Sequence, residues 1–474
     1  MPARLGGRIM TIEQAISNES WIGAFVRTRT LTEYPHGAKR WGLLVLTMLA
    51  SVLVSYEFHL APVLPLMLPY LHLSKIEYGF FLSFGVPVGA IAAIYGGPLA
   101  DRYGRVVVID SCLAILIVLV FANLLITNIP TFLVVRYSMG IIGGLIAGAI
   151  AALVRDMSPR VSRALAFGLF TVGPVGSNWL VNFVAGKTLP IYHTWQSQFW
   201  IMGFLSIVII IPILLWLSDL SPELRMQVFR SEMAEREAQG KKQPAPEDLP
   251  SGVRDAYGRL LRHTEVWLLS VGVMCFLMLY TLVTMLGPLM FSEAFHYSPG
   301  DAARLNANFW LANAGALLFF GWVSDRLQTR KPLAIIGTVV GAAVTVYWIP
   351  FFGQTPPERT LAWIATVLGA FLAAGYIPWA AQFSETLEDI SPALQATGWA
   401  FFGLIGRVWG VVVAPLSLYI VSRYGWAVWI KVCVGGMVFY IVAMALSRGP
   451  FYKFAHSTGQ AAEEGAAEMT SAGG

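Results

Sequence analysis

Long apolar runs dominate the chain and alternate with short polar stretches. Each run is about as long as the roughly 20 residues that a helix needs to cross the hydrocarbon core of a bilayer. The runs fall into two blocks of six and predict spans near 42–70, 77–100, 106–127, 131–154, 164–186, 197–218, 265–291, 303–323, 332–352, 360–382, 396–421 and 425–447. The pattern therefore predicts an all-α membrane protein with twelve transmembrane helices.

The polar stretches divide the chain into five parts. We expect a cytoplasmic N-terminal segment over 1–40, a six-helix bundle over 41–218, a cytoplasmic central loop over 219–263, a second six-helix bundle over 264–450 and a disordered cytoplasmic tail over 451–474. Residues 11–27 fit either an amphipathic helix on the membrane surface or a disordered segment. Ser221 and Pro222 have the residue types of a helix start, so a short helix is expected in the central loop.

Lys and Arg concentrate in the N-terminal segment, the even-numbered loops and the central segment. Because cytoplasmic loops of membrane proteins carry an excess of these residues, both termini are expected in the cytoplasm, with the protein in the plasma membrane.

Composition supports the membrane class. The 474 residues are 56% hydrophobic and only 12% charged, about half the charged share of an ordinary soluble domain. The net charge of +5 is small, and no basic patch alternates with aromatic residues, which argues against a nucleic-acid partner. Cys112, Cys275 and Cys433 are scattered through apolar runs, so neither a disulfide framework nor a zinc site is expected. We expect no cofactor and no metal.

An internal repeat relates the two blocks. GGPLADRYGR at 96–105 follows the second span, and GWVSDRLQTRK at 321–331 follows the eighth. Ser-Pro pairs at 158–159 and 391–392 precede the fifth and eleventh spans in the same way. Two halves related by such a repeat are an architecture of secondary transporters, in which the substrate site lies between the halves.

The stretch Gly97-Pro-Leu-Ala-Asp101-Arg102-Tyr-Gly104-Arg105 closely resembles the loop signature of the major facilitator superfamily. It departs from that signature at Val106, and the second copy has Gln328 where glycine is typical. The resemblance covers about residues 40–450. It implies a monomeric carrier that works by alternating access, driven by a proton or solute gradient.

The chemistry of these loops predicts a cytoplasmic gate. Gly97 and Gly104 permit unusual backbone angles or close approach, and Asp101 can pair with an arginine. The expected gating residues are Gly97, Asp101, Arg102, Gly104, Arg105, Asp110, Asp325 and Arg326. The alternative is that these charges only anchor the loops on the cytoplasmic side.

Arg407 is the most informative charge within a span. It lies near the middle of the eleventh span between Gly403, Gly406 and Gly410. A guanidinium is always charged and matches a carboxylate or phosphate with two parallel hydrogen bonds, so we expect it to bind an anionic substrate. The alternative is a structural ion pair with Glu57.

Glu57 and His59 lie near the middle of the first span and are candidates for the coupling proton, because both can titrate near neutral pH there. Alternatively, His59 packs with a satisfied hydrogen bond and Glu57 is a fixed partner of Arg407. Pro62, Pro65 and Pro69 follow and should bend the outer half of this helix.

Arg136 precedes Gly140, Gly144 and Gly148 at four-residue spacing. This arrangement resembles the fourth-helix signature of the same superfamily, which implies a role for Arg136 in proton coupling. The glycines should let helices pack closely. The alternative is that the Arg136 side chain extends to the membrane–water interface on the outer side.

Polar and aromatic residues of the spans complete the candidate substrate site. The candidates beside Arg407 are Tyr56, Asn178, Asn182, Asn313, Tyr376, Trp379 and Gln382. Gly173-Pro174-Val-Gly176 in the fifth span partly resembles the antiporter signature of the superfamily, and the alternative is a simple kink.

These features together predict a proton-coupled secondary active transporter of a small organic anion of the carboxylate type. No phosphate-binding loop for ATP and no catalytic triad is present, so the protein is not expected to be an enzyme. The expected partners are the lipid bilayer, a small-molecule substrate and the proton. Two alternatives remain: a proton-coupled efflux antiporter for drugs or other amphiphiles, and a transporter-like receptor without flux.

Overall fold

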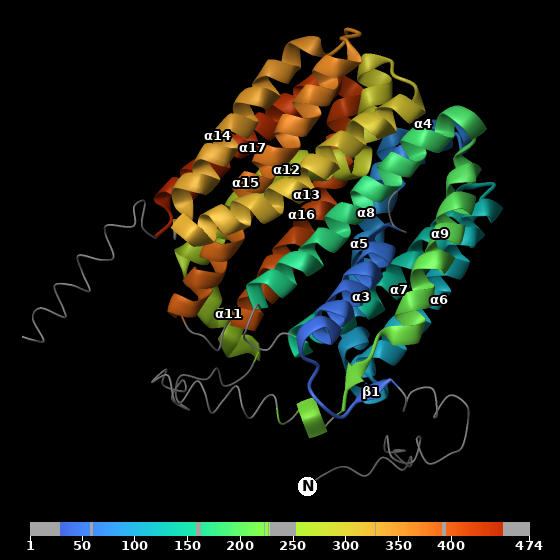
Figure 1. Ribbon diagram of the computed structural model, residues 1–474. Helices are drawn as coiled ribbons and strands as arrows, with labels where there is room; N and C mark the ends of the chain where they lie inside the picture. Colours follow the sequence, from blue (N-terminus) through green and yellow to red (C-terminus); the bar gives the residue numbers. More distant parts are fainter. Residues whose placement is uncertain are drawn as a thin grey trace, which may run out of the picture. The chain divides into compact units, whose positions relative to one another are not determined.

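A computed structural model describes residues 29–56, 60–157, 163–221, 223–225, 227, 253–327, 329–390 and 395–448 (Figure 1). Almost all of these residues are helical, as the apolar runs predict. The all-α membrane fold is therefore confirmed. The amphipathic segment expected over 11–27, Glu57, His59 and the tail after 448 lie outside the described residues.

Ten helices of the described chain are long and apolar enough to cross a membrane. The long helices are α3 (Gly37–Tyr56), α5 (Lys75–Tyr103), α6 (Arg105–Ala122), α7 (Ile129–Asp156), α8 (Arg163–Tyr192), α9 (Trp195–Trp216), α12 (Thr264–Phe295), α13 (Pro299–Leu327), α14 (Lys331–Trp348), α15 (Glu358–Ile390), α16 (Gln395–Tyr424) and α17 (Trp426–Leu446). Of these, α8 and α13 do not belong to the ten apolar spans, although they have 30 and 29 residues. The count of twelve spans stays a prediction.

The first predicted span is interrupted. The helix α3 ends at Tyr56, and the chain continues through the 3-10 turn η1 (Ala61–Val63) into the short helix α4 (Leu64–Tyr70). Pro62, Pro65 and Pro69 lie in these two elements. Since proline removes a backbone donor and crowds the preceding turn, three prolines at this spacing favour short helical pieces over one straight helix.

The chain forms two compact units. Unit 1 contains Met1–Phe58, Pro87–Pro174 and Phe199–Lys242, and unit 2 contains His59–Val86, Val175–Gln198 and Gln243–Gly474. The helices α5 and α8 therefore contribute one end to each unit. The domain boundaries expected from the sequence remain predictions.

Glycines set the close packing of α5 on α7 in unit 1. A Cβ atom added at Gly96 would collide with the carbonyl oxygen of Leu145, and one at Gly144 would collide with that of Gly89. The prediction that the glycines of the fourth span allow close approach is thus confirmed at Gly144.

A two-stranded parallel ladder also lies in unit 1, where the sequence predicts no strand. Strand β1 (Thr30–Leu31) pairs with β2 (Asp219–Leu220), with Thr30 opposite Asp219. It joins the segment before the first span to the segment after the sixth (Figure 1). The helix expected after Ser221 has its cap, because the Ser221 hydroxyl accepts a hydrogen bond from the Leu224 amide at 3.2 Å.

Unit 2 has an aromatic core built on the helices from α12 to α17. Fully buried tryptophans come from four of them: Trp310, Trp348, Trp379 and Trp429. A further helix, α11 (Val253–Leu261), precedes α12. This core holds α16, and with it Arg407, in the same unit as the first part of α5.

Substitution of the adjacent residues Gly96 and Gly97 tests this packing. Gly96→Ala should destabilise the protein by about 1–3 kcal/mol, because the new methyl group would lie 2.9 Å from Leu145 Cα. Gly97→Ala is the matched control, since no atom lies within 4 Å of its Cβ position. Both gain the same helix propensity. The thermal unfolding midpoint in detergent should fall only for Gly96→Ala, and equal midpoints for the two variants would contradict the packing described.

Candidate transport site and gates

Arg407 is the residue around which the candidate substrate site is built. It lies in the middle of α16, its side chain is exposed, and no hydrogen bond or ion pair joins it to another described residue. A Cβ atom at Gly403 would lie 4.0 Å from Arg407 Nη1, so the guanidinium extends over the glycine one turn earlier. The absence of a side chain at Gly403 therefore leaves room for this cation along the helix.

The direction in which Arg407 projects follows from the contacts of α16 with α5. Ser83 of α5 donates a hydrogen bond to the carbonyl of Val411 at 2.9 Å. One turn further, a Cβ at Gly79 would lie 2.9 Å from Pro415 Cα, so the two backbones nearly touch. Because residues four apart share a helix face, Arg407 lies on the same face of α16 as Val411. Arg407 therefore lies on the face of α16 that contacts α5 one and two turns further along.

Asn313, predicted to bind substrate, is fully buried in this structure and both ends of its amide are used. Its oxygen accepts a hydrogen bond from the Tyr280 hydroxyl at 2.8 Å, and its nitrogen donates to the Gly369 carbonyl at 2.8 Å. The amide therefore links α12, α13 and α15. Tyr280 also packs edge-on against Trp310.

The other candidates on α15 hold that helix against its neighbours. Trp379 is fully buried and donates its indole N–H to the Leu269 carbonyl at 3.0 Å. The Gln382 nitrogen donates to the Ser447 hydroxyl and to the Arg448 carbonyl at 3.0 and 2.8 Å. Tyr376 packs beside Trp379, with ring centroids 5.6 Å apart. These contacts give Trp379 and Gln382 a structural role in the conformation described.

The asparagines of α8 meet one from α13. The Asn306 nitrogen donates to the Asn182 oxygen at 3.1 Å, and the Asn182 nitrogen donates to the Asn178 carbonyl at 2.8 Å. Asn182 and Asn306 are fully buried. A buried amide pair joins segments only while they remain close, because separation would leave polar groups unsatisfied.

A second contact between distant segments of unit 2 involves Lys75, Glu293 and Trp426. The Lys75 ammonium lies 2.7 Å from Glu293 Oε2, and Trp426 Nε1 donates to the same oxygen at 2.9 Å. The Lys75 cation also lies 5.9 Å from the Trp426 ring centroid. We call these three residues the latch, because they join the start of α5 to the end of α12 and the start of α17. The latch was not predictable from the sequence, because three residues so far apart in the chain form no motif.

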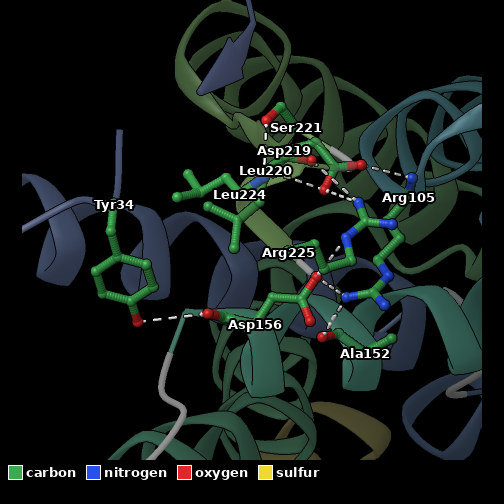
Figure 2. A network of polar contacts seen from close by, with 9 residues as sticks. All are labelled: Tyr34, Arg105, Ala152, Asp156, Asp219, Leu220, Ser221, Leu224 and Arg225. Carbon is green, nitrogen blue, oxygen red and sulfur yellow. Dashed lines mark hydrogen bonds and ion pairs between the residues drawn. The ribbon is translucent and has the colours of Figure 1, made fainter. Parts of the chain in front are cut away.

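A buried charge network organises the loops of unit 1 that contain the family signature (Figure 2). Gly104 has a φ of +95°, which favours glycine, and ends the loop before α6. The first backbone N–H of α6, on Arg105, donates to Asp219 Oδ2 at 2.8 Å. The Arg105 guanidinium pairs with Asp156 and donates to the Ala152 carbonyl at 2.8 Å. A carboxylate thus satisfies the helix N-terminus, as the dipole requires.

Arg225 and Arg29 extend this network. Arg225 Nη2 lies 2.9 Å from Asp219 Oδ1, and its Nε lies 3.2 Å from Asp156 Oδ2. Arg29 pairs with Asp110 on α6 and donates to the Leu217 and Ile213 carbonyls at the end of α9 at 2.8 and 3.1 Å. Asp110 was predicted as a gating residue without a named partner, and the structure pairs it with Arg29 of the N-terminal segment.

The second copy of the signature forms a smaller cluster in unit 2. Arg330 Nη1 lies 2.8 Å from Asp325 Oδ1, and its Nε lies 3.0 Å from Glu385 Oε1. Burial opposes the charged form of Arg330, but the hydrogen bonds and charges of Asp325 and Glu385 outweigh it and raise the pKa of its guanidinium. Arg326 instead lies over the Trp322 ring, 5.4 Å from its centroid.

The remaining predicted site and gating residues have few contacts with other described residues, or lie outside the described part of the chain. Arg136 is half-buried on α7 with its Nη1 3.5 Å from the Met139 sulfur. Arg102 is exposed and lies over the Tyr103 ring. Gly97 has no atom within 4 Å of its Cβ position. Glu57, His59 and the side chains of Tyr56 and Asp101 lie outside what the structure describes, so their roles stay predictions.

Comparison with known proteins identifies the class. The sequence model described as the Major Facilitator Superfamily matches residues 43–413, which is most of the chain. The chain belongs to this superfamily and is a membrane transporter, not an enzyme. The D-xylose–proton symporter has a similar fold, with a TM-score of 0.63 and 16% identity over 86% of this chain and 98% of that one.

The sequence is similar to transporters of different substrates within the superfamily. The 3-(3-hydroxy-phenyl)propionate transporter of Escherichia coli is 26% identical over 54% of this chain and 58% of its own length. The gallate transporter of Pseudomonas putida is 23% identical over 65% and 71%. The multidrug resistance protein MdtG of Salmonella typhi is 32% identical over 33% and 40%. The matched region thus spans between two fifths and about seven tenths of these relatives.

The charge network predicts a large stability difference between two aspartates. Asp156→Asn removes the carboxylate from Arg105, whose side chain is only 11% exposed, and should cost about 3–5 kcal/mol. Asp325→Asn, at a side chain that is 65% exposed, should cost at most about 1 kcal/mol. Thermal unfolding of the two variants in the same detergent measures the difference. Equal losses of stability would show that the network is not buried as described.

Loss of the latch should make Ser83 more accessible. Ser83 lies on α5 about two turns after Lys75, at the contact with α16. In a variant without native cysteines that carries Ser83→Cys, Lys75→Met should accelerate maleimide labelling by up to about fivefold, as expected from the energy of a partly exposed ion pair. Asp301→Asn is the control, because it breaks an ion pair within α13. The latch has no such role if Lys75→Met and Asp301→Asn label at the same rate.

Proposed function

We propose that this transporter carries a small organic anion, an aromatic carboxylate in the first instance, and that protons drive it. The single observation that supports the proposal most strongly is Arg407, a cation in the middle of a transmembrane helix without an ion pair among the described residues. Membrane insertion of an arginine at a helix centre costs about 2.5–3.5 kcal/mol even on the mildest scale. An arginine at this position without a fixed counter-charge is suited to bind an anionic substrate reversibly.

The names of two relatives support the same class of substrate. Both 3-(3-hydroxyphenyl)propionate and gallate are aromatic carboxylates. The guanidinium of Arg407 would bind the carboxylate through two hydrogen bonds, and aromatic candidates of the site such as Tyr376 would contact the ring. The other candidate contacts of the substrate remain Tyr56, Asn178, Asn182, Asn313, Tyr376, Trp379 and Gln382. Some of these side chains form hydrogen bonds within the protein in the described conformation. In this proposal they exchange those bonds for contacts with the substrate during transport.

The proposed cycle uses contacts that form and break. The latch and the Asn182–Asn306 pair would close one side of the protein, and the charge clusters around Arg105 and Asp325 would close the side that we assign to the cytoplasm. Glu57, His59 and Arg136 are the proposed proton-coupling residues. We place both termini in the cytoplasm, in accordance with the distribution of Lys and Arg. We also propose a monomer in the plasma membrane, as the family implies.

A second candidate, proton-coupled efflux of drugs, is favoured by the similarity to MdtG and by the Gly173-Pro174 stretch. However, Gly173 also has a packing explanation. A Cβ atom there would lie 2.8 Å from Ser51 Oγ, so the glycine lets α8 approach α3. An anion carrier is therefore the stronger proposal.

Transport by purified protein in liposomes tests the role of Arg407. Arg407→Ala should lower uptake of 3-(3-hydroxyphenyl)propionate or gallate by at least about tenfold, because a charge-assisted hydrogen bond contributes about 1.5–3 kcal/mol. Arg407→Lys should retain part of the activity, since it keeps the charge and loses the paired geometry. Arg423→Ala, at an exposed position near the end of α16, is the matched control and should transport normally.

The same liposomes distinguish the two candidates. A lower pH on the side of the substrate should stimulate uptake of the carboxylate, whereas a cationic drug should be neither transported nor competitive. Normal carboxylate uptake by Arg407→Ala would refute the assigned role of Arg407. Proton-driven export of a cationic drug without carboxylate transport would refute the anion proposal in favour of efflux.

A further inference from the structure

A groove on the surface of unit 2 has no part in the proposed cycle. It has a volume of about 800 Å³ and is lined by residues at the ends of α14 and α15 that face each other. These two helices are neighbours in that unit. Its lining residues are Val339, Val340, Ala343, Val344, Tyr347, Pro357, Arg359, Thr360 and Trp363. The volume is within the range of small-molecule sites.

The walls of the groove are apolar and exposed. Val339, Tyr347 and Trp363 are 48%, 54% and 56% exposed. On a helix that spans a membrane, exposed apolar side chains meet lipid, and tyrosine and tryptophan are typical of the level where the headgroups begin. The groove therefore presents hydrocarbon-like walls with an aromatic rim.

One end of the groove carries a positive charge. Arg359 is the second residue of α15, is exposed, and forms no ion pair with any residue that the structure describes. The neighbouring carboxylate of Glu358 does not pair with it: Glu358 Oε1 accepts hydrogen bonds from Arg304 at 2.8 and 3.0 Å, and Arg304 also pairs with Asp301. A cation thus lies at the rim of an apolar groove.

The length of the groove fits one lipid leaflet. From Val339 to Tyr347 the helix α14 rises about 12 Å. This approaches the roughly 15 Å thickness of half the hydrocarbon core. A lipid whose headgroup lies at Arg359 would therefore have its acyl chain along Val339, Val340 and Ala343.

We propose that this groove binds an anionic phospholipid, with the phosphate and acidic headgroup at Arg359 and an acyl chain between α14 and α15. Charge complementarity selects this occupant: a zwitterionic lipid would fill the same apolar walls but would gain less from the guanidinium. The site is separate from Arg407 and does not depend on the substrate proposed above.

Native mass spectrometry of the full chain in detergent tests the proposal, with dioleoyl phosphatidylglycerol and dioleoyl phosphatidylcholine as probes. The wild type should retain phosphatidylglycerol in preference to phosphatidylcholine. Arg359→Gln should lower this preference about fivefold, the effect expected for one basic residue near a lipid headgroup. Arg423→Gln, which removes an exposed charge outside the groove, should leave the preference unchanged.

A groove-filling variant separates headgroup binding from chain binding. Ala343→Phe should reduce retention of both lipids while the thermal unfolding midpoint without added lipid stays close to that of the wild type. Should that variant be unstable, Val340→Phe provides a second test of the same wall. Equal loss of preference in Arg359→Gln and Arg423→Gln would overturn the proposal in favour of diffuse attraction. Full competition by soluble glycerol phosphate would overturn it by showing that the groove binds no acyl chain.

Discussion

An ionised side chain in a membrane helix must have a partner, because the surrounding hydrocarbon offers none. Most charged groups at the ends of the helices meet this requirement in the described structure. Asp110 has Arg29, Arg105 has Asp156, and Lys331 donates to the carbonyl of Ser447. Arg407 has a different environment. It lies in the middle of α16, its guanidinium extends over Gly403, and it shares a helix face with the contact to α5 at Val411. The proposed function rests on the contrast between these paired charges and Arg407, a cation in the middle of a helix that has no ion pair among the described residues.

Unit 2 contains Arg407 together with segments from both halves of the sequence. Close approach at Gly79 brings the start of α5 against α16, and a Cβ atom added at Gly186 of α8 would lie 3.1 Å from the Arg304 backbone nitrogen. These first-half segments thus pack within the same compact unit as the second-half helices. The contacts are few and partly polar, as in the latch and the Asn182–Asn306 pair. The ion pair of the latch is partly exposed, so its exchange for water costs little, whereas the buried amide pair is held more firmly.

The sequence predicted the helical architecture well because that architecture depends on local features. Apolar run length, proline positions and the glycines of the fourth span each act within one helix or on its nearest neighbour. The irregular outer part of the first span, where the prolines predicted a bend, and the close packing at Gly144 were accessible in this way. The family signature also placed Gly104 and Arg105 at a loop with unusual backbone geometry.

The charge partners were not accessible from the sequence. Arg29 appeared only as one of several basic residues of the N-terminal segment, yet it binds Asp110 and the end of α9. Lys75 and Glu293 are more than 200 residues apart, and no periodicity relates them. Likewise, Asn313 and Gln382 are polar residues within apolar helices, which made them candidates for substrate binding. The sequence could not reveal that their side chains form hydrogen bonds with other groups of the protein.

Calorimetric binding of a matched ligand pair tests the central claim most directly. The carboxylate 3-(3-hydroxyphenyl)propionate and its neutral primary amide have nearly the same shape and differ in charge. If Arg407 binds the anion, the wild type should bind the carboxylate at least about tenfold more tightly than the amide, and Arg407→Gln should abolish that preference. Equal affinity of the wild type for the two ligands, or an unchanged preference in the variant, would contradict the account.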